Sequence, residues 1–220
     1  MKTPRLRAGL SLICSAVVIG TTLGSLAVFF LRTGDGNMAV HGTLAFRYFT
    51  VDSNILCALA CAGLIPAAVK GLGTGVFSPS RRALMWKYVG AGAVGLTFAV
   101  VMVFLGPVFG YGMMFRGMNL FLHLINPLAA MISFLLWEQG EALDKGMILW
   151  ADLPMAIYGI VYLLMVIVLR RWPDFYGFNM GGLWYVSYLA VLLGMTAIAA
   201  LLRLGHNAMC KKETNSTYKE

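Results

Sequence analysis

Six long runs of apolar residues constrain this chain more than any other feature of its sequence. Each run has about 20 residues or more, the length that a helix needs to cross the roughly 30 Å hydrocarbon core of a bilayer. Hydrocarbon offers the backbone no hydrogen-bond partner, and the runs lack the alternating pattern of a transmembrane barrel. The sequence therefore predicts an all-α, polytopic membrane protein with six transmembrane helices. The runs cover residues 9–31, 44–69, 84–106, 118–137, 147–169 and 183–202.

The composition leaves little room for anything besides these helices. Hydrophobic residues make up 60% of the 220 residues and charged residues 12%, so no separate soluble domain fits. We expect one transmembrane domain over residues 1–206 and a polar, disordered cytoplasmic tail over residues 207–220. The four cysteines have neither the spacing of a disulfide framework nor that of a zinc site, so we expect no metal and no cofactor.

The net charge of +8 is explained by topology. The Lys and Arg residues lie at the ends of the apolar runs and form no patch interleaved with aromatics, which argues against a nucleic-acid partner. With both termini in the cytoplasm, twelve of these residues are cytoplasmic and five are outside, so the positive-inside rule predicts an N-in, C-in protein. The compact loops favour a bacterial inner membrane over a eukaryotic endomembrane or plasma membrane. The cytoplasmic set is Lys2, Arg5, Arg7, Lys70, Arg81, Arg82, Lys87, Lys145, Arg203, Lys211, Lys212 and Lys219, and the outer set is Arg32, Arg47, Arg116, Arg170 and Arg171.

Polar residues inside the second run form the first cluster of interest. The string FRYFTVDSN places Arg47, Thr50 and Asn54 on one helix face, because they are three and four residues apart. Asp52 points elsewhere. Polar groups are costly inside a membrane, so such a cluster indicates function.

The fourth run holds the second cluster, in the string NLFLHLINPL. His123 shares a helix face with Asn119, Asn126 and Pro127. An ionisable side chain inside a membrane indicates a functional site, with a catalytic base, a proton relay, a haem ligand and a structural hydrogen bond as alternatives. Thr50 and His123 lie about 9 Å and 8 Å below the starts of two helices that both enter from the outer side. Because the two depths match closely, the side chains could meet as a nucleophile and base pair in the outer leaflet.

The chemistry of such a pair is that of ester cleavage. A threonine hydroxyl is a weak nucleophile until a base takes its proton, and the neutral imidazole of His123 does this near neutral pH. Attack on an ester carbonyl creates an oxyanion, for which Asn54, Asn126 or a backbone N–H near Pro127 are the candidate donors. The ordinary alternative for Thr50 is a hydrogen bond to the carbonyl four residues earlier.

Two further charged residues of these runs have open roles. Arg47 is a candidate for binding a substrate carboxylate or a lipid phosphate, and it equally suits an arginine that reaches the headgroups. Asp52 is a candidate for pairing with an arginine, for marking an ion path, or for orienting His123. Asp152, in the string WADLP, is more typical of an N-cap at the start of the fifth helix.

Both clusters resemble the family of the androgen-induced protein and the androgen-dependent tissue-factor-pathway-inhibitor-regulating protein, which includes bacterial members with six predicted transmembrane helices. The strings DLPMAIYGIVYLL and RRWPDFYGFNMGG resemble the same family, so the resemblance extends from the second run to the sixth. It implies an intramembrane threonine hydrolase of fatty acid esters of hydroxy fatty acids, with Thr50 as the nucleophile and His123 as the histidine. Asp52 departs from the family, whose members commonly carry an uncharged polar residue there.

Two other classes of function remain open at this point. In a small transporter or channel, Arg47, Asp52 and His123 would line a polar path for protons or an anionic solute. In a non-catalytic lipid-binding protein, the same cluster would hold a lipid without turning it over. In the leading interpretation, the partner of the protein is a membrane lipid or a fatty acid ester.

Overall fold

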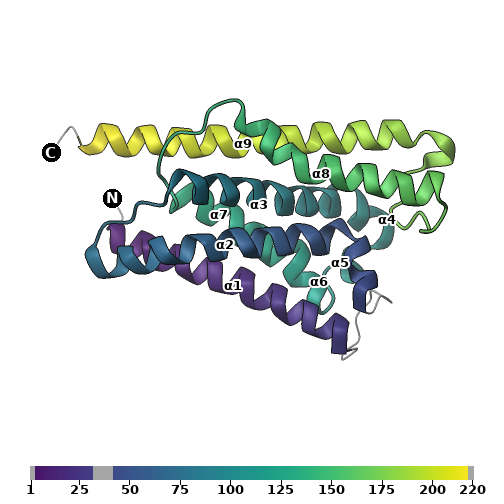
Figure 1. The fold of residues 1–220 in the computed structure, drawn as a ribbon, viewed down its shortest axis with the longest axis horizontal. Coiled ribbons are helices and arrows are strands. Elements are labelled where there is room, and N and C mark those ends of the chain that lie inside the picture. Colours follow the sequence, from purple (N-terminus) through teal and green to yellow (C-terminus); the bar gives the residue numbers. More distant parts are fainter. Residues whose placement is uncertain (1–2, 32–41, 218–220) are drawn as a thin grey trace.

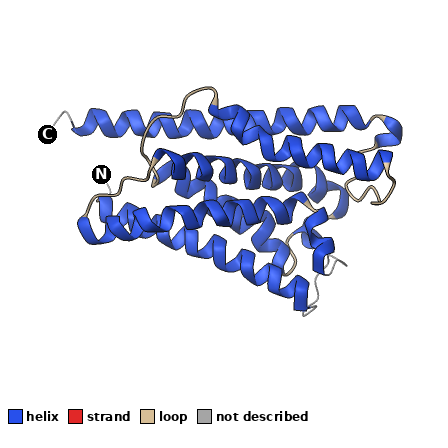
Figure 2. Cartoon of the chain, in the orientation of Figure 1, coloured by secondary structure: helices blue, strands red, loops and turns tan. Residues whose placement is uncertain are grey.

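The fold is all-helical in the computed structural model, which describes residues 3–31 and 42–217. Every regular element within these residues is a helix (Figure 2). The α-helices are α1 (Pro4–Leu31), α2 (Phe49–Thr74), α3 (Arg81–Val100), α4 (Gly106–Phe109), α5 (Tyr111–Met114), α6 (Met118–Leu120), α7 (Asn126–Leu136), α8 (Met147–Leu163) and α9 (Trp184–Thr217). The other helical elements of the described residues are three π-helical turns, Val101–Leu105, Phe121–Ile125 and Leu164–Val168, and two 3-10 helices, Gly42–Arg47 and Met180–Gly182.

Six helices in the described residues are long and apolar enough to cross a membrane. They match the six predicted runs in number and order, which confirms the all-helical class and indicates an integral membrane protein. The start of α1 and the end of α9 lie toward the same end of the bundle, as an even number of crossings requires (Figure 1). The helices are Pro4–Leu31, Phe49–Thr74, Arg81–Phe109, Met118–Leu136, Met147–Val168 and Trp184–Lys211.

The outer surface of the bundle is rich in large apolar side chains. Leu59 of α2 is 67% exposed, Val103 after α3 is 79% exposed and Leu193 of α9 is 69% exposed. Water would disfavour so much contiguous apolar surface, whereas lipid tails would not. The surface therefore agrees with helices that face hydrocarbon.

Helix α3 lies at the centre of the bundle, packed against α2, α7, α8 and α9 (Figure 1). Glycines in α3 allow this close packing. A Cβ atom on Gly90 would lie 2.9 Å from the Cα of Cys57 in α2, and one on Gly92 would lie 2.8 Å from the terminal methyl of Met195 in α9. Small residues at such contacts let helix backbones approach closely, and dispersion contacts between the helices then contribute to stability.

Helix α9 runs beyond residue 206, where the sequence predicted the start of a disordered tail, and continues to Thr217. Asn207 belongs to the packed structure, because its side chain accepts from the N–H of Leu143 and donates to the carbonyl of Leu143, both at 2.8 Å. Adding residues to an existing helix is far easier than nucleating a new one, which accounts for the extension. Residues 218–220 of the predicted tail lie outside the described residues.

Lys87, which the charge count placed on the cytoplasmic side, is fully buried inside the bundle. Its Nζ lies 3.4 Å from Oε1 of Glu138, which is also fully buried, and it donates to Sγ of Cys61 at 3.1 Å. Ser11 donates its hydroxyl to the same carboxylate oxygen at 2.8 Å. This cluster links α1, α2 and α3 to the end of α7, and Cys61 is eleven residues, roughly 16 Å, along α2 from Thr50.

Candidate active site

Thr50 lies in the first turn of α2 and is 5% exposed. The chain reaches it through the 3-10 helix Gly42–Arg47 and then Tyr48, whose extended backbone delays the start of α2 relative to the predicted run. The first N–H of a helix lacks a helical partner, and here the N–H of Phe49 donates to the hydroxyl oxygen of Tyr176 at 3.1 Å. Burial raises the pKa of Tyr176, so this hydroxyl stays protonated.

His123 lies in the π-helical turn Phe121–Ile125. The N–H of Asn126 bonds there to the carbonyl five residues back, in place of four. Pro127 follows and has no N–H, so the carbonyl of Leu122 is left without a partner in its own helix. Single π-helical turns of this kind occur frequently at functional sites.

Thr50 and His123 come together as a dyad, which we define as these two side chains. The Oγ1 of Thr50 lies 3.4 Å from Nε2 of His123, and Nδ1 of His123 lies 2.8 Å from the carbonyl oxygen of Met114. A carbonyl can only accept a hydrogen bond, so Nδ1 carries the proton of the neutral ring. The lone pair is therefore on Nε2 and faces the hydroxyl, which is the arrangement that a general base requires.

The main-chain carbonyl of Met114, and not Asp52, orients the imidazole of His123. The short helix that carries Met114 is in turn held in place by a hydrogen bond and a chain reversal. Tyr111 donates its hydroxyl to the carbonyl of Met102 at 2.7 Å. That carbonyl is free because it lies in the π-helical turn after α3 and five residues before Pro107, which has no N–H. Gly110, with a φ of 89°, lets the chain reverse between α4 and α5.

The two asparagines predicted as oxyanion donors form hydrogen bonds with the protein itself. Asn54 donates to the carbonyls of Thr50, at 2.7 Å, and Leu122, at 3.0 Å. Asn126 donates to Oδ1 of Asn54 at 2.9 Å and to the hydroxyl of Thr22 at 3.3 Å. Each amide therefore uses both of its hydrogens and is fully buried. In this geometry neither amide has a hydrogen left to donate to an oxyanion, and Asn54 and Asn126 instead tie α1, α2 and α7 together beside the dyad.

A cavity of about 490 Å³ adjoins the dyad. Its volume is within the range of roughly 300–1,000 Å³ that is usual for small-molecule sites. Most of its wall is apolar and aromatic, and both members of the dyad are among its polar lining residues. The lining residues are Leu44, Arg47, Tyr48, Thr50, Leu105, Phe109, Met113, Met114, Asn119, His123, Pro173, Phe175 and Tyr176.

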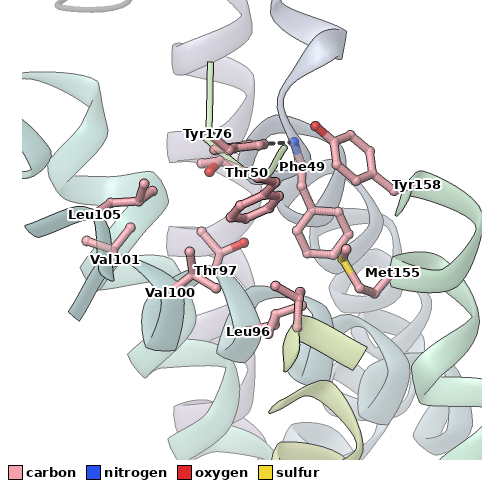
Figure 3. A pocket seen from close by; sticks show the side chains of 12 residues that line it. Phe49, Thr50, Leu96, Thr97, Val100, Val101, Leu105, Met155, Tyr158 and Tyr176 are labelled. Atoms are coloured by element: carbon pink, nitrogen blue, oxygen red, sulfur yellow. Dashed lines mark hydrogen bonds between the residues drawn. The ribbon is translucent and has the colours of Figure 1, made fainter. Parts of the chain in front are cut away.

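A second, smaller cavity of about 30 Å³ also borders Thr50 (Figure 3). Side chains of α3 and the turn after it, among them Leu96 and Val101, form one side of it, and Met155 of α8 lies on the other side. Both cavities share Leu105 in their walls. Thr50 therefore has apolar space next to it in addition to the main cavity.

Arg47 lines the main cavity, whereas Asp52 does not. The guanidinium of Arg47 lies 5.6 Å from the ring centroid of Trp172, and no carboxylate among the described residues pairs with it. Asp52 is half-buried in the first turn of α2, where the positive end of the helix dipole favours a carboxylate. The structure thus supports Arg47 as a cavity residue and assigns Asp52 no contact with the dyad.

Sequence reasoning missed how the loop between α8 and α9 shapes the site. Asp174 accepts from the N–H groups of Phe178 and Asn179, both at 2.9 Å, and from the hydroxyl of Tyr162 at 2.7 Å. These bonds hold the loop so that Phe175 and Tyr176 line the cavity. The aromatic string WPDFYGF was visible in the sequence, but nothing in it indicated which helices the rings would cover.

Other titratable groups lie apart from the dyad. His206 of α9 is fully buried, and its ring stacks on Phe134 with the two ring centroids 4.6 Å apart. None of the four cysteines, all of which lie in the described residues, forms a disulfide. Within the described residues, no group of three or more His, Cys, Asp or Glu side chains is placed to hold a metal ion.

The structure thus brings Thr50, His123 and Arg47 to the wall of one cavity. Comparison of the chain with protein-family models, curated proteins and solved structures finds no match. The family resemblance therefore rests on the sequence strings alone. The site geometry and that resemblance together carry the functional conclusion.

Proposed function

We propose that the protein is an intramembrane lipid esterase that hydrolyses fatty acid esters, with Thr50 as the nucleophile and His123 as the general base. One observation carries the proposal. The lone pair of His123 Nε2 faces the Thr50 hydroxyl at 3.4 Å, beside a largely apolar cavity, with Nδ1 held on the Met114 carbonyl. A buried hydroxyl and imidazole in this arrangement have the recognised geometry of an activated nucleophile, and catalytic hydrogen bonds are often longer before substrate binds.

The acylation step follows from this geometry. The Thr50 oxygen forms a bond to the ester carbonyl carbon, its proton passes to Nε2 of His123, and the carbonyl π electrons move to oxygen. The tetrahedral oxyanion then collapses, the bond to the alcohol oxygen breaks, and the imidazolium gives its proton to that oxygen. The products of this step are a free alcohol and an acyl ester of Thr50.

Deacylation repeats the sequence with water. A water oxygen bonds to the acyl carbon while Nε2 of His123 takes one of its protons, and collapse of the second oxyanion breaks the bond to the Thr50 oxygen. His123 returns the proton to that oxygen, which releases a fatty acid and regenerates the dyad. The net reaction consumes one ester and one water, and it requires no cofactor.

The cavity suggests how the substrate lies. Its apolar and aromatic wall suits an acyl chain, and Arg47 suits an anionic group such as a substrate carboxylate or a lipid phosphate. The topology follows from the charge count: both termini face the cytoplasm, the dyad lies in the outer leaflet, and substrate enters laterally from lipid. The host membrane in this proposal is a bacterial inner membrane.

The test compares purified wild-type protein with Thr50→Ala and His123→Ala on branched fatty acid esters. Each variant should lose at least about 10²-fold in turnover, because the nucleophile or its base is missing. A fluorophosphonate probe should label the wild type and not Thr50→Ala. Thr74→Ala is the matched control, since this threonine at the other end of α2 bonds only to the backbone of Lys70 and Val76 and should keep full activity. Undiminished turnover in either dyad variant removes the assigned role.

The same proteins separate the competing functions. A transporter or channel predicts solute flux in proteoliposomes that depends on His123 and is indifferent to Thr50→Ala. A non-catalytic lipid-binding protein predicts copurified lipid with neither turnover nor probe labelling. Hydrolysis that requires both members of the dyad excludes both alternatives as the main activity.

A further inference from the structure

Asn119 is a buried amide whose side chain has no hydrogen-bond partner among the described residues. It is 7% exposed and lines the same cavity as the dyad. Its backbone N–H, by contrast, bonds to the carbonyl of Arg116. Buried side-chain amides are nearly always paired, so an unpaired one needs an explanation. Asn119 lines the cavity, so we look for the missing partner of its amide in the molecule that the cavity binds.

The position of Asn119 relative to the dyad is fixed by the fold. It lies four residues before His123 in the same membrane-length helix, so the two side chains project from one helix face. Thr50 borders the same cavity from α2. A substrate carbonyl that meets the Thr50 hydroxyl therefore lies in a space that also receives the Asn119 amide.

We propose that the side-chain N–H of Asn119 donates to the oxyanion that forms when Thr50 attacks the ester; this inference rests on the esterase function proposed above. As the Oγ1–C bond forms and the carbonyl electrons move to oxygen, the negative charge develops in a cavity lined by a buried donor that no described protein group occupies. A hydrogen-bond donor that is screened from bulk water stabilises such a charge strongly. The N-terminal end of α2, where Thr50 lies, adds the favourable end of a helix dipole.

The other donors near the dyad fit this role less well. Asn54 and Asn126 have no amide hydrogen left, because protein acceptors take all of them. Arg47 lies over Trp172 and is half-buried. Tyr48 is another neutral donor on the cavity wall, but it is half-buried and packs its ring on Phe175 at 4.5 Å. Asn119 is more buried than either Arg47 or Tyr48.

The experiment measures kcat and KM for Asn119→Ala, Asn119→Asp and Asn119→Ser beside the wild type. Loss of one oxyanion donor lowers kcat by about 10²–10³-fold, and KM should change little. Asn119→Asp should lose at least as much, since a carboxylate repels the oxyanion, and Asn119→Ser should recover part of the rate through its hydroxyl. An alkyl boronic acid, which forms a tetrahedral anion on the Thr50 oxygen, should bind Asn119→Ala more weakly by a similar factor, whereas an uncharged fatty amide should bind unchanged.

One control and one comparison make the outcome specific. Asn179→Ala is the control: it removes an asparagine that does not line the cavity, and it should keep the wild-type kcat. Tyr48→Phe is the comparison: it removes the competing hydroxyl donor on the cavity wall, and its loss in kcat should be smaller than that of Asn119→Ala. If Asn119→Ala fails to fold, as judged by size-exclusion chromatography, the nearly isosteric Asn119→Asp carries the comparison.

Each result decides the inference. An unchanged kcat in Asn119→Ala, a loss confined to KM, or a large loss in Tyr48→Phe alone overturns the role of Asn119 while leaving the esterase function intact. A wild-type protein that neither hydrolyses esters nor binds the boronic acid overturns the proposed function, and this inference falls with it.

Discussion

The buried ion pair between Lys87 and Glu138 gives the sharpest prediction about stability. Neither side chain has any exposed surface, and their charged atoms are 3.4 Å apart. The variants are Lys87→Met, Glu138→Leu and the double variant that carries both changes. Each single variant leaves one charge buried without its partner, whereas the double variant leaves none.

The magnitudes follow from the geometry. At an effective dielectric constant of about 20, two charges 3.4 Å apart attract by about 5 kcal/mol. The cost of removing both charges from water offsets much of this attraction, so the pair as a whole contributes little net stability. Removing one partner alone should cost about 3–5 kcal/mol, and in Glu138→Leu the Ser11 hydroxyl also loses its acceptor. The double variant should lie within about 1 kcal/mol of the wild type or be more stable.

Thermal unfolding in detergent, followed by tryptophan fluorescence, measures the effect. For a chain of this size, 3–5 kcal/mol corresponds to a decrease of about 6–20 °C in Tm. Arg81→Met is the matched control, because Arg81 pairs with Asp144 at 2.8 Å but the two side chains are 54% and 60% exposed. Its cost should be at most about 1 kcal/mol, since water screens an exposed pair.

Two patterns of Tm among the variants would contradict this electrostatic explanation. Single variants as stable as the wild type would mean that water or a shifted backbone solvates the remaining charge. A double variant that loses the sum of the single losses would mean that the cluster stabilises the bundle through its packing and hydrogen bonds. In either case the penalty of an unpaired buried charge would not govern the stability of the cluster.

Two further predictions concern helix packing and the loop over the cavity. Gly90→Ala should lower Tm and cost about 1–3 kcal/mol of unfolding free energy, because the added Cβ would press on the backbone of Cys57. Gly63→Ala is the control: its Cβ would have no neighbour within 4 Å, so the change should be neutral or stabilising by up to about 1 kcal/mol. Asp174→Ala should speed amide hydrogen exchange in the loop between α8 and α9 and raise KM, because the loop N–H groups and the Tyr162 hydroxyl lose the carboxylate that accepts from them. Unchanged exchange in this loop would contradict the role of Asp174.

The sequence predicted the helices well because hydrophobicity is a local property that adds along the chain. Six apolar runs of membrane length became six helices. Their ends differ from the predicted ones by at most five residues, except that the sixth helix continues from residue 202 to Lys211. The largest displacement at the site is at α2, which starts at Phe49 although its apolar run begins at residue 44. The intervening residues, Gly42–Arg47, form a 3-10 helix that ends at an extended Tyr48. Hydrophobicity does not distinguish that turn from the α-helix that follows.

The sequence also determined the candidate dyad in part. Helical periodicity and rise gave the face and the depth of Thr50 and His123, and these two quantities were enough to predict that contact between them was sterically possible. The sequence could not predict the tautomer of His123, because the group that orients its ring is the main-chain carbonyl of Met114. Every residue has a main-chain carbonyl, so the residue type does not show which carbonyl is available to accept a hydrogen bond.

Only the tertiary structure decided which polar groups are free and which are occupied. The sequence predicted Asn54 and Asn126 as free donors, but protein oxygens accept all of their amide hydrogens. Asn119, from the same polar face as Asn126, lines the cavity and has no such acceptor among the described residues. The charge count placed Lys87 on the cytoplasmic side, but only the structure shows that its side chain is buried against Glu138. Periodicity fixes a side chain's direction from its own helix, but its partner comes from another helix, and the packing of distant segments determines which one.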